Sequence, residues 1–187
     1  MRIASGLHRV GSQIVNSYLI AGHDGVTIID AGLPGYWKLL QAELAAMGKS
    51  LGDVRALILW YSARRGGLRP QPATELRTIA DGDVLDVPGS PRIIHTPGHT
   101  PGSVAVHVPA LDALFLGDTM TTRNVLTGVT GPKPAPFTLE PEQAVASLGR
   151  VEGVDATWLL PGHGPAWDGG VPEAIRLIRE TTAESRT

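Results

Sequence analysis

The feature that most constrains the fold is a histidine enclosed by two Pro-Gly pairs, in residues 95–103 with the sequence HTPGHTPGS. Proline fixes φ and glycine permits positive φ, so each pair favours a tight turn. An apolar pair precedes the segment, and an apolar run follows it at residues 104–108. We therefore expect His99 to lie on a shaped loop between two strands.

Two later segments repeat this design. Residues 114–117 form a hydrophobic run that ends in glycine and is followed by Asp118. Residues 158–160 form a second run, which leads into Pro-Gly-His-Gly and so presents His163. Three strands therefore each carry one side chain able to bind a metal at the point where the strand ends, and we expect His99, Asp118 and His163 to meet.

The order of the remaining elements predicts the architecture. Apolar runs rich in β-branched residues indicate strands, and apolar residues at steps of three and four indicate helices. We expect strands within 2–31, with a hairpin turn at 22–25, and further strands at 54–60, 84–87, 92–94, 104–108, 113–116 and 157–160. We expect helices between 33 and 48, at 141–148 and from 171, and a long loop at 119–139. Because a helix buries only one stripe of side chains, this α/β (α+β) order predicts two packed sheets with helices outside.

Length and composition limit the class of protein. The chain has 187 residues with 42% hydrophobic and 18% charged residues, which suits a single domain over residues 1–187. The net charge of −2, without a basic block, predicts neither a nucleic acid nor a membrane surface as partner. The absence of cysteine excludes disulfides and thiolate sites. The start of the chain lacks the apolar core of a signal peptide, and the longest apolar run, 56–61, is too short to span a bilayer, so we expect a cytoplasmic protein.

Five segments in this order resemble the metallo-β-lactamase superfamily. They are residues 16–20 (NSYLI), 28–32 (IIDAG), 95–103, 115–118 (FLGD) and 160–164 (LPGHG), and they extend over nearly the whole chain. The resemblance implies a four-layer αββα sandwich with its site along one edge of the sheets. It also implies that His99, Asp118 and His163 correspond to the last three metal ligands of the family.

The family's first ligand loop, His-x-His-x-Asp-His, has no counterpart here. That loop should follow the strand at 56–60, but residues 60–65 read WYSARR and contain neither histidine nor a carboxylate. The helix and strand that should follow are also missing, because almost nothing separates Gly67 from Leu68. The resemblance therefore predicts a sandwich that is shortened in its first half and a reduced metal site.

Three interpretations of the site remain open. His99, Asp118 and His163 are a two-histidine, one-carboxylate set that suits at most one divalent ion, with zinc favoured. In the family the two histidines serve different ions, so a single ion would have to settle between them. Alternatively the three residues bind no metal and are held by turns and hydrogen bonds. In a third interpretation Arg64 or Arg65 replaces the metal, and either pairs with Asp118 or binds an anionic group of the substrate.

A few further residues are candidates for supporting roles. Tyr61 is a possible acid or hydrogen-bond donor, although a tyrosine that ends a strand commonly serves packing. Asp30 ends a strand and resembles a family residue that supports the metal loop. We expect Thr119, Arg123 and Asn124, which begin the long loop after Asp118, to contact the substrate. By contrast, His95 is expected to make a structural hydrogen bond.

These features favour a divergent hydrolase-like protein that transforms a small ester, lactone or thioester, or catalyses a related acid–base step. With one metal, its bound water would attack. Without metal, Asp118 or a histidine would be the general base, and Arg64 or Arg65 would stabilise the oxyanion. The alternative is a catalytically inactive pseudo-enzyme that binds a ligand or a partner, with homodimerisation as one way to cover an exposed sheet edge. A third possibility is a truncated or engineered scaffold.

Overall fold

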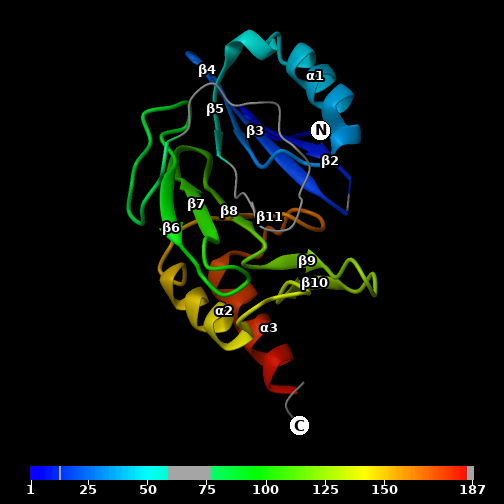
Figure 1. Cartoon of the computed structure of the whole chain (residues 1–187), viewed down its shortest axis with the longest axis vertical. Coiled ribbons are helices and arrows are strands. Elements are labelled where there is room, and N and C mark those ends of the chain that lie inside the picture. The colour runs from blue at the N-terminus through cyan, green and yellow to red at the C-terminus, as the bar shows by residue number, and fades with distance from the viewer. Residues whose placement is uncertain (13, 59–76, 185–187) are drawn as a thin grey trace.

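The computed structural model describes residues 1–12, 14–58 and 77–184, arranged in four layers. Helix α1 (Trp37–Ala46) covers one sheet, a second sheet packs against the first, and helices α2 (Pro141–Ser147) and α3 (Val171–Glu184) lie beyond the second sheet (Figure 1). This arrangement confirms the predicted αββα sandwich. No helix within these described ranges is long and apolar enough to cross a membrane.

The first sheet has the strand order β1-β2-β3-β4-β5. Its strands are Arg2–Ala4, Leu7–Gly11, Asn16–Gly22, Gly25–Ile29 and Val54–Ile58. Neighbours are antiparallel except β4 and β5, which are parallel and are joined through α1. Gly22 pairs with Gly25 and closes the predicted hairpin.

The second sheet brings the ends of three strands to one edge. Its strands are β6 (Arg92–His95), β7 (Val104–Val108), β8 (Ala113–Gly117) and β11 (Trp158–Pro161), in the order β11-β8-β7-β6. Strand β11 is parallel to β8, and β7 is antiparallel to both β6 and β8. The carboxyl ends of β6, β8 and β11 therefore lie at the same edge, and His99, Asp118 and His163 follow these ends.

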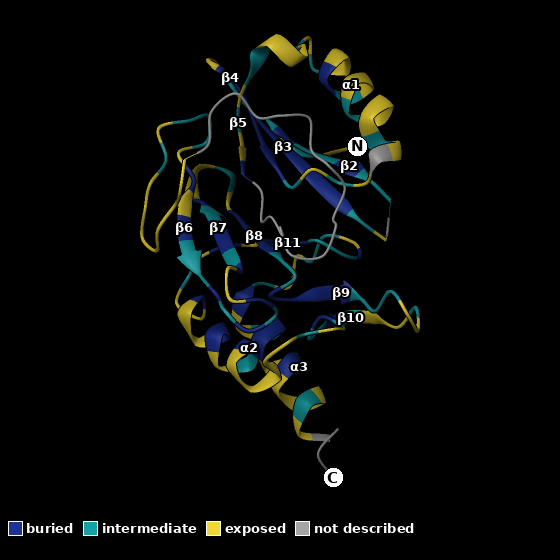
Figure 2. Cartoon of the chain, viewed as in Figure 1, coloured by how far each residue is buried: buried dark blue, intermediate teal, exposed yellow. Residues whose placement is uncertain are grey.

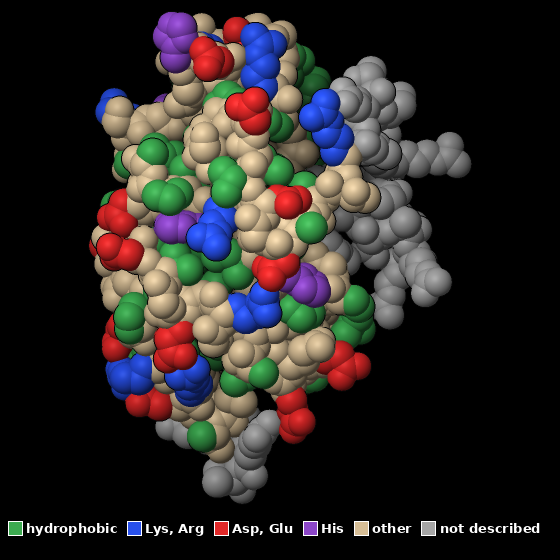
Figure 3. Space-filling model, turned by 90° about the vertical axis from the view of Figure 1, so that its left-hand side faces the viewer, with side chains coloured by type: hydrophobic (Ala, Val, Ile, Leu, Met, Phe, Trp, Pro, Cys, Tyr) green, Lys and Arg blue, Asp and Glu red, His purple; other side chains and the backbone are tan. Residues whose placement is uncertain are grey.

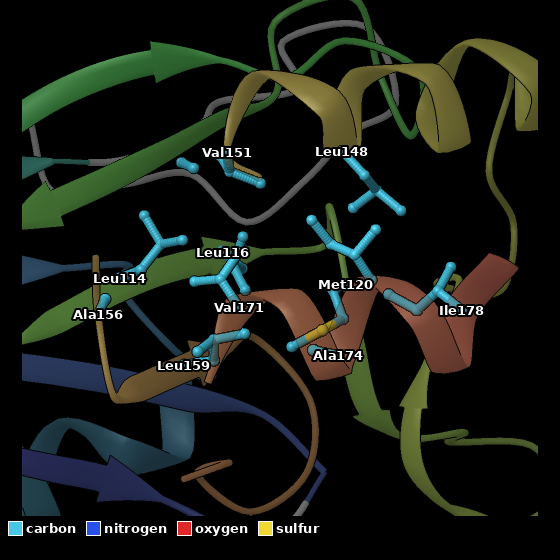
Figure 4. Packing of buried hydrophobic residues seen from close by; sticks show 12 residues of the cluster. Leu114, Leu116, Met120, Leu148, Val151, Ala156, Leu159, Val171, Ala174 and Ile178 are labelled. Atoms are coloured by element: carbon cyan, nitrogen blue, oxygen red, sulfur yellow. The ribbon is translucent and has the colours of Figure 1, made fainter. Parts of the chain in front are cut away.

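Three hydrophobic clusters hold the layers together, and Figure 2 shows the buried residues concentrated in the strands and on the inner sides of the helices. Between the sheets, Tyr18 of β3 contacts Phe115 of β8 edge to face, with ring centroids 5.3 Å apart. Under α1, Leu44 packs on the outer face of the first sheet. Helix α3 buries Val171, Ala174, Ile175 and Ile178 beneath the second sheet, as their helical spacing predicts (Figure 4).

The structure corrects three of the predicted elements. Residues 84–87 form no strand, only a single bridge from Val84 to Arg92, because Pro88 and Pro91 lack the N–H groups that a ladder needs. The predicted long loop contains a hairpin of β9 (Thr121–Arg123) and β10 (Thr130–Lys133), in which Pro132 is tolerated on a short edge strand. The apolar run at 54–60 predicts a buried strand, but in β5 only Ile58 is buried, since this strand lies at the end of its sheet as far as the structure describes it.

The helical surface carries exposed ion pairs that add little stability. Arg176 of α3 pairs with Glu173 and Glu180 on its own helix, and Arg179 pairs with Glu152. Such exposed pairs contribute between zero and about 1 kcal/mol each. On the face shown in Figure 3, acidic and basic side chains are likewise interspersed.

Candidate active site

The three side chains predicted to meet do meet at the edge of the second sheet. His163 Nε2 lies 3.2 Å from Asp118 Oδ1, and His99 Nε2 lies 3.5 Å from Asp118 Oδ2. All three side chains are largely removed from solvent, with exposed fractions of 23% for His163, 33% for Asp118 and 15% for His99. One carboxylate is therefore placed between two imidazoles.

The loop that carries His163 is attached to the first sheet. Asn16 of β3 donates its Nδ2–H groups to the carbonyl oxygens of Pro161 and Gly164, at 2.9 and 2.7 Å. The Tyr18 hydroxyl donates to the same Pro161 oxygen at 2.7 Å. Residues 161–164, together with these donors from β3, are called the His163 arm below. A buried polar residue at the start of a strand thus positions a histidine that is distant in the sequence.

The ring of His163 is held in one orientation. Its Nδ1 makes a short hydrogen bond with the backbone carbonyl of Ile14. A carbonyl oxygen only accepts, so Nδ1 carries the proton and donates it. In neutral His163 the lone pair is therefore on Nε2, the atom that faces Asp118.

The loop that carries His99 is attached to α2 instead. Gly98 has a φ of +137°, and a Cβ there would overlap backbone atoms of Ala144. The Gly98 carbonyl accepts the Glu140 N–H at 2.9 Å, and the His99 carbonyl accepts the Leu139 N–H at 3.2 Å. Residues 96–103, together with these contacts to residues 138–144, are called the His99 arm below. Glycine at position 98 is required by both the backbone conformation and the close approach.

The ring of His99 carries its proton on the same nitrogen, Nδ1, as that of His163. Its Nδ1 lies 3.2 Å from the Thr138 hydroxyl oxygen, and that hydroxyl donates its own proton to the Ala135 carbonyl at 2.7 Å. The Thr138 oxygen must therefore accept from His99 Nδ1–H. The lone pair of neutral His99 is again on Nε2, directed at Asp118.

This arrangement needs a positive charge at its centre. Two nitrogen lone pairs face the two oxygens of one carboxylate, and the buried Oδ1 of Asp118 has no hydrogen bond from any residue that the structure describes. Either added protons or a metal ion would satisfy these atoms. A histidine that binds a metal through one ring nitrogen usually donates the N–H of its other ring nitrogen to a nearby acceptor, as both histidines do here. The two distances between a histidine Nε2 and an Asp118 oxygen, 3.2 and 3.5 Å, are also close to the separation of neighbouring ligand atoms around a tetrahedral zinc ion, which is roughly 3.3 Å.

The described residues do not by themselves form a complete metal site. Each histidine faces a different oxygen of Asp118, and no group of three or more metal-binding side chains surrounds a common point within residues 1–12, 14–58 and 77–184. The sequence from 59 to 67 adds neither histidine nor a carboxylate. The described residues therefore do not reproduce the two-ion site of the family, and an ion bound here would have to be shared through Asp118.

The charges in the site shift several pKa values. Burial raises the pKa of Asp118, but the adjacent His163 and then His99 outweigh it and hold that pKa below its ordinary value. Contact with Asp118 raises the pKa of His163, although burial opposes the shift. Burial, and secondarily the charge of Asp118, raises the pKa of Asp30 to about 7. Asp30, Asp118 and His163 therefore influence one another's charge and form one electrostatic cluster.

A cavity of about 240 Å³ opens beside this cluster. The described residues that line it come from both sheets and from the loops at their edge: Val15, Asn16, Ile29, Asp30, Ala31, Gly32, Ile58, His99, Ser103, Val104, Val106, Phe115, Gly117, Asp118, Gly162 and His163. Asp30 lies at this edge with a φ of +62°, a conformation that costs a residue other than glycine about 1 kcal/mol or more. The cavity combines a few polar groups with apolar walls, as small-molecule sites commonly do.

The other predicted site residues lie elsewhere. Tyr61, Arg64 and Arg65 are outside the described residues. Thr119 is buried and its hydroxyl is 2.7 Å from that of Thr96, while Asn124 Oδ1 accepts two N–H groups of its own loop. Neither these two residues nor Arg123 belongs to the described lining of the cavity, so a role in substrate contact stays a prediction for all three.

Sequence reasoning missed two of the residues that hold the histidines. Asn16 was visible as a polar residue within an apolar strand, which is a signal of a buried hydrogen-bonding role. Thr138 lies in a loop 39 residues from His99 and gave no signal. The structural role predicted for His95 is confirmed, because its Nε2 lies 2.8 Å from the Pro101 carbonyl.

Comparison with known proteins identifies similar sequences and folds. The sequence model of the metallo-beta-lactamase superfamily matches residues 10–59 and 62–163. A curated relative, the beta-lactamase-like protein 2 homolog of Caenorhabditis elegans, is 21% identical over 198 residues, which are 93% of this chain and 64% of the relative. This chain thus spans less than two thirds of that relative's length.

Solved structures share the fold at low sequence identity. A metallo-beta-lactamase family protein from Thermus thermophilus has a TM-score of 0.71 at 19% identity, covering 97% of this chain and 81% of that one. A metallo-beta-lactamase from Cronobacter sakazakii with a HARLDQ motif has a TM-score of 0.72 at 18% identity, covering 99% and 93%. At these identities the likeness establishes the architecture alone.

Proposed function

The chain belongs to the metallo-beta-lactamase superfamily, and from this premise we propose that it is a single-metal hydrolase acting on a small ester, lactone or thioester. The observation that carries the proposal is the common orientation of two histidines. Both donate Nδ1–H to fixed acceptors, and both direct Nε2 at Asp118. That orientation suits a shared cation better than it suits a purely structural cluster.

The residues that would hold the metal are His99, Asp118 and His163. When bound, a divalent ion supplies a water of lowered pKa and polarises the carbonyl of the substrate. The protein contributes the fixed orientation of the imidazoles, through Ile14 and Thr138. It also contributes apolar cavity walls, which exclude bulk water from the reacting carbonyl.

An inactive binding protein is the alternative, and one observation favours it. Residues 59–67 contain none of the histidine or carboxylate ligands of the family's first loop. A site with fewer ligands holds metal less firmly, and a protein with such a site could keep the cavity for binding alone. The two functions differ in metal content and in turnover.

The test begins with protein purified without added metal. We expect about one equivalent of divalent metal per chain, with zinc favoured, and turnover of at least one compound in a panel of esters, lactones and thioesters. Treatment with a chelator should abolish turnover, and one equivalent of zinc should restore it. Protein that contains no metal and binds none upon titration would contradict the proposal. Metal binding without turnover across the panel would favour the inactive binding protein.

Variants connect the activity to the site. His163→Gln and Asp118→Asn should each lower kcat/KM by about a hundredfold or more, because each removes a metal ligand. The matched control is His23→Gln, since His23 is fully exposed in the β3–β4 turn, where its ring lies within hydrogen-bond distance of Asp24. A loss of activity that is equal in the control and in the site variants would argue against the assignment.

A further inference from the structure

Asp30 is a charged residue of the cavity that the proposed metal site does not use. It directly follows strand β4 and lines the same cavity as Asp118 and His163, whose charges act on its carboxyl group. Its backbone N–H donates to the Ile58 carbonyl at 2.9 Å, which fixes the residue at this edge of the sheet. Its carboxylate makes no hydrogen bond or salt bridge with any residue that the structure describes. Asp30 therefore contributes an unpaired carboxylate to the site.

The environment of this carboxylate penalises its negative charge. Burial, and then the charge of Asp118, raises the pKa of Asp30 to about 7. The family residue that Asp30 resembles supports the first ligand loop, whose histidines and carboxylate have no counterpart in the sequence of residues 59–67. A buried carboxylate without a partner costs free energy, and a cation placed beside it removes that cost. Asp30 is therefore a place where a positively charged group binds favourably.

The chemistry of the cavity favours an organic cation at Asp30. The described part of the cavity lining holds two carboxylates, those of Asp30 and Asp118, and neither lysine nor arginine. A metal ion needs several ligands, and Asp30 belongs to no group of three or more metal-binding side chains within residues 1–12, 14–58 and 77–184. An alkylammonium group has no such need, because it carries a full charge and three N–H donors.

We propose that Asp30 determines substrate specificity by binding a primary ammonium group, so that the substrate is an ester, lactone or thioester that also carries an amine. The carbonyl of the substrate lies at His99, Asp118 and His163, and its ammonium group lies against Asp30 in the same cavity. This inference rests on the proposed function for the position of the carbonyl. The contact between ammonium and carboxylate needs no turnover, so binding alone tests it.

The first experiment compares amides in which an ammonium group replaces a methyl group of similar size. The pairs are β-alaninamide with butanamide, and 4-aminobutanamide with pentanamide, each titrated at about pH 8 into the protein as purified. In at least one pair the ammonium compound should bind about tenfold or more tightly than its neutral partner, because the contact is a charge-assisted hydrogen bond. Equal affinities within both pairs would overturn the proposal.

The second experiment removes the charge of Asp30 and keeps its shape. Asparagine also tolerates the φ of +62° at this position, so Asp30→Asn preserves the backbone. The preference for the ammonium compound should fall to about threefold or less in this variant. The matched control is Asp24→Asn, because Asp24 is exposed in the β3–β4 turn, and it should keep the full preference. A preference that survives in Asp30→Asn would place the ammonium group elsewhere and contradict the proposal.

The stability of Asp30→Asn distinguishes binding from a structural role. The carboxylate has no partner to lose, so this variant should be at least as stable as the unsubstituted protein in urea at about pH 8. A variant that fails to fold, or that unfolds at a clearly lower urea concentration, would show that the carboxylate supports the fold and would overturn the proposal.

A pair of ethyl esters separates this inference from the proposed function. A higher kcat/KM for β-alanine ethyl ester than for ethyl butanoate, lost in Asp30→Asn, supports both. Tighter binding of the ammonium amides without turnover of either ester supports the role of Asp30 and counts against the hydrolase. Equal kcat/KM for the two esters supports the hydrolase and overturns the role of Asp30.

Discussion

The two arms that deliver the histidines are built from different parts of the molecule. The His163 arm is held by side chains of β3, which belong to the other sheet and donate to its backbone carbonyls. The His99 arm is held by backbone contacts with α2 and by the Thr138 hydroxyl, all within the half of the chain that forms the second sheet. The position of His163 therefore depends on how the two sheets pack, whereas that of His99 depends on local packing against α2.

Asp118 keeps its contacts with both histidines only if both arms hold their positions. Asp118 follows β8, between the two arms, and contacts one histidine on each side. A shift of either arm by about 1 Å would separate an imidazole from its oxygen and lower the affinity for a shared cation. Substitutions that weaken one arm at a time are the means of testing this comparison.

The largest effect is expected from Gly98→Ala on the His99 arm. The added Cβ overlaps backbone atoms of Ala144, and the φ of +137° is strained for alanine. We expect the free energy of unfolding to decrease by about 3 kcal/mol or more, measured by urea denaturation. Gly149→Ala is the control, because a Cβ at Gly149 meets nothing within 4 Å and the change should be near zero. Equal stability of the two variants would contradict the description of this arm.

Asn16→Ala should have the next largest effect and should act on the His163 arm. The variant loses two buried hydrogen bonds, and the Gly164 carbonyl loses its Asn16 donor. We expect a destabilisation of about 2 kcal/mol in urea, with a metal affinity that falls at least tenfold. Asn124→Ala, which removes hydrogen bonds within an exposed loop, should leave the metal affinity unchanged. The comparison of the arms fails if the two asparagine variants bind metal equally.

Tyr18→Phe should weaken the same arm less. Asn16 still donates to the Pro161 carbonyl after the Tyr18 hydroxyl is removed, so no carbonyl of the arm loses its last donor. We expect a loss of about 1 kcal/mol in the free energy of unfolding, measured in urea beside Asn16→Ala. A loss larger than that of Asn16→Ala would show that the tyrosine, and not the asparagine, is the main attachment.

The pH dependence of stability provides a further test in metal-free protein. Asp118 raises the pKa of His163 above its ordinary value of 6.5, so the folded state binds the proton more tightly than the unfolded chain does. The resulting stabilisation is complete below pH 6.5 and is lost as the pH rises through the folded pKa. We expect the free energy of unfolding in EDTA to decrease as the pH rises above about 6.5, and His163→Gln to remove part of that decrease.

Asp30 adds a decrease of the same sign over a lower range. Its pKa of about 7 lies above its ordinary value of 3.8, so the protonated carboxyl stabilises the fold and this stabilisation is lost between about pH 4 and pH 7. Urea denaturation of Asp30→Asn should show a flatter profile over this range. If neither Asp30→Asn nor His163→Gln changes the profile, the electrostatic connection within the cluster is wrong.

The sequence predicts the elements of the site whose causes are local. Pro-Gly pairs around His99, a hydrophobic run before Asp118 and the Pro-Gly-His turn at 163 each specify a strand end, and three such ends on one sheet bring the side chains together. What holds the rings is not local. Any residue has a carbonyl like that of Ile14, and Thr138 becomes an acceptor only after a loop folds against α2. The β9–β10 hairpin was missed because its glycine and proline residues also favour loops.

Nitrogen-15 NMR of the side chains, at a pH high enough for both imidazoles to be neutral, measures directly which ring nitrogen of His99 and of His163 carries the proton. We expect His99 and His163 both to carry their proton on Nδ1 in metal-free protein. Both Nε2 signals should shift on addition of zinc and stop shifting at about one equivalent. Protons on Nε2 of the neutral rings, or Nε2 signals that do not respond to zinc, would contradict a shared cation at Asp118.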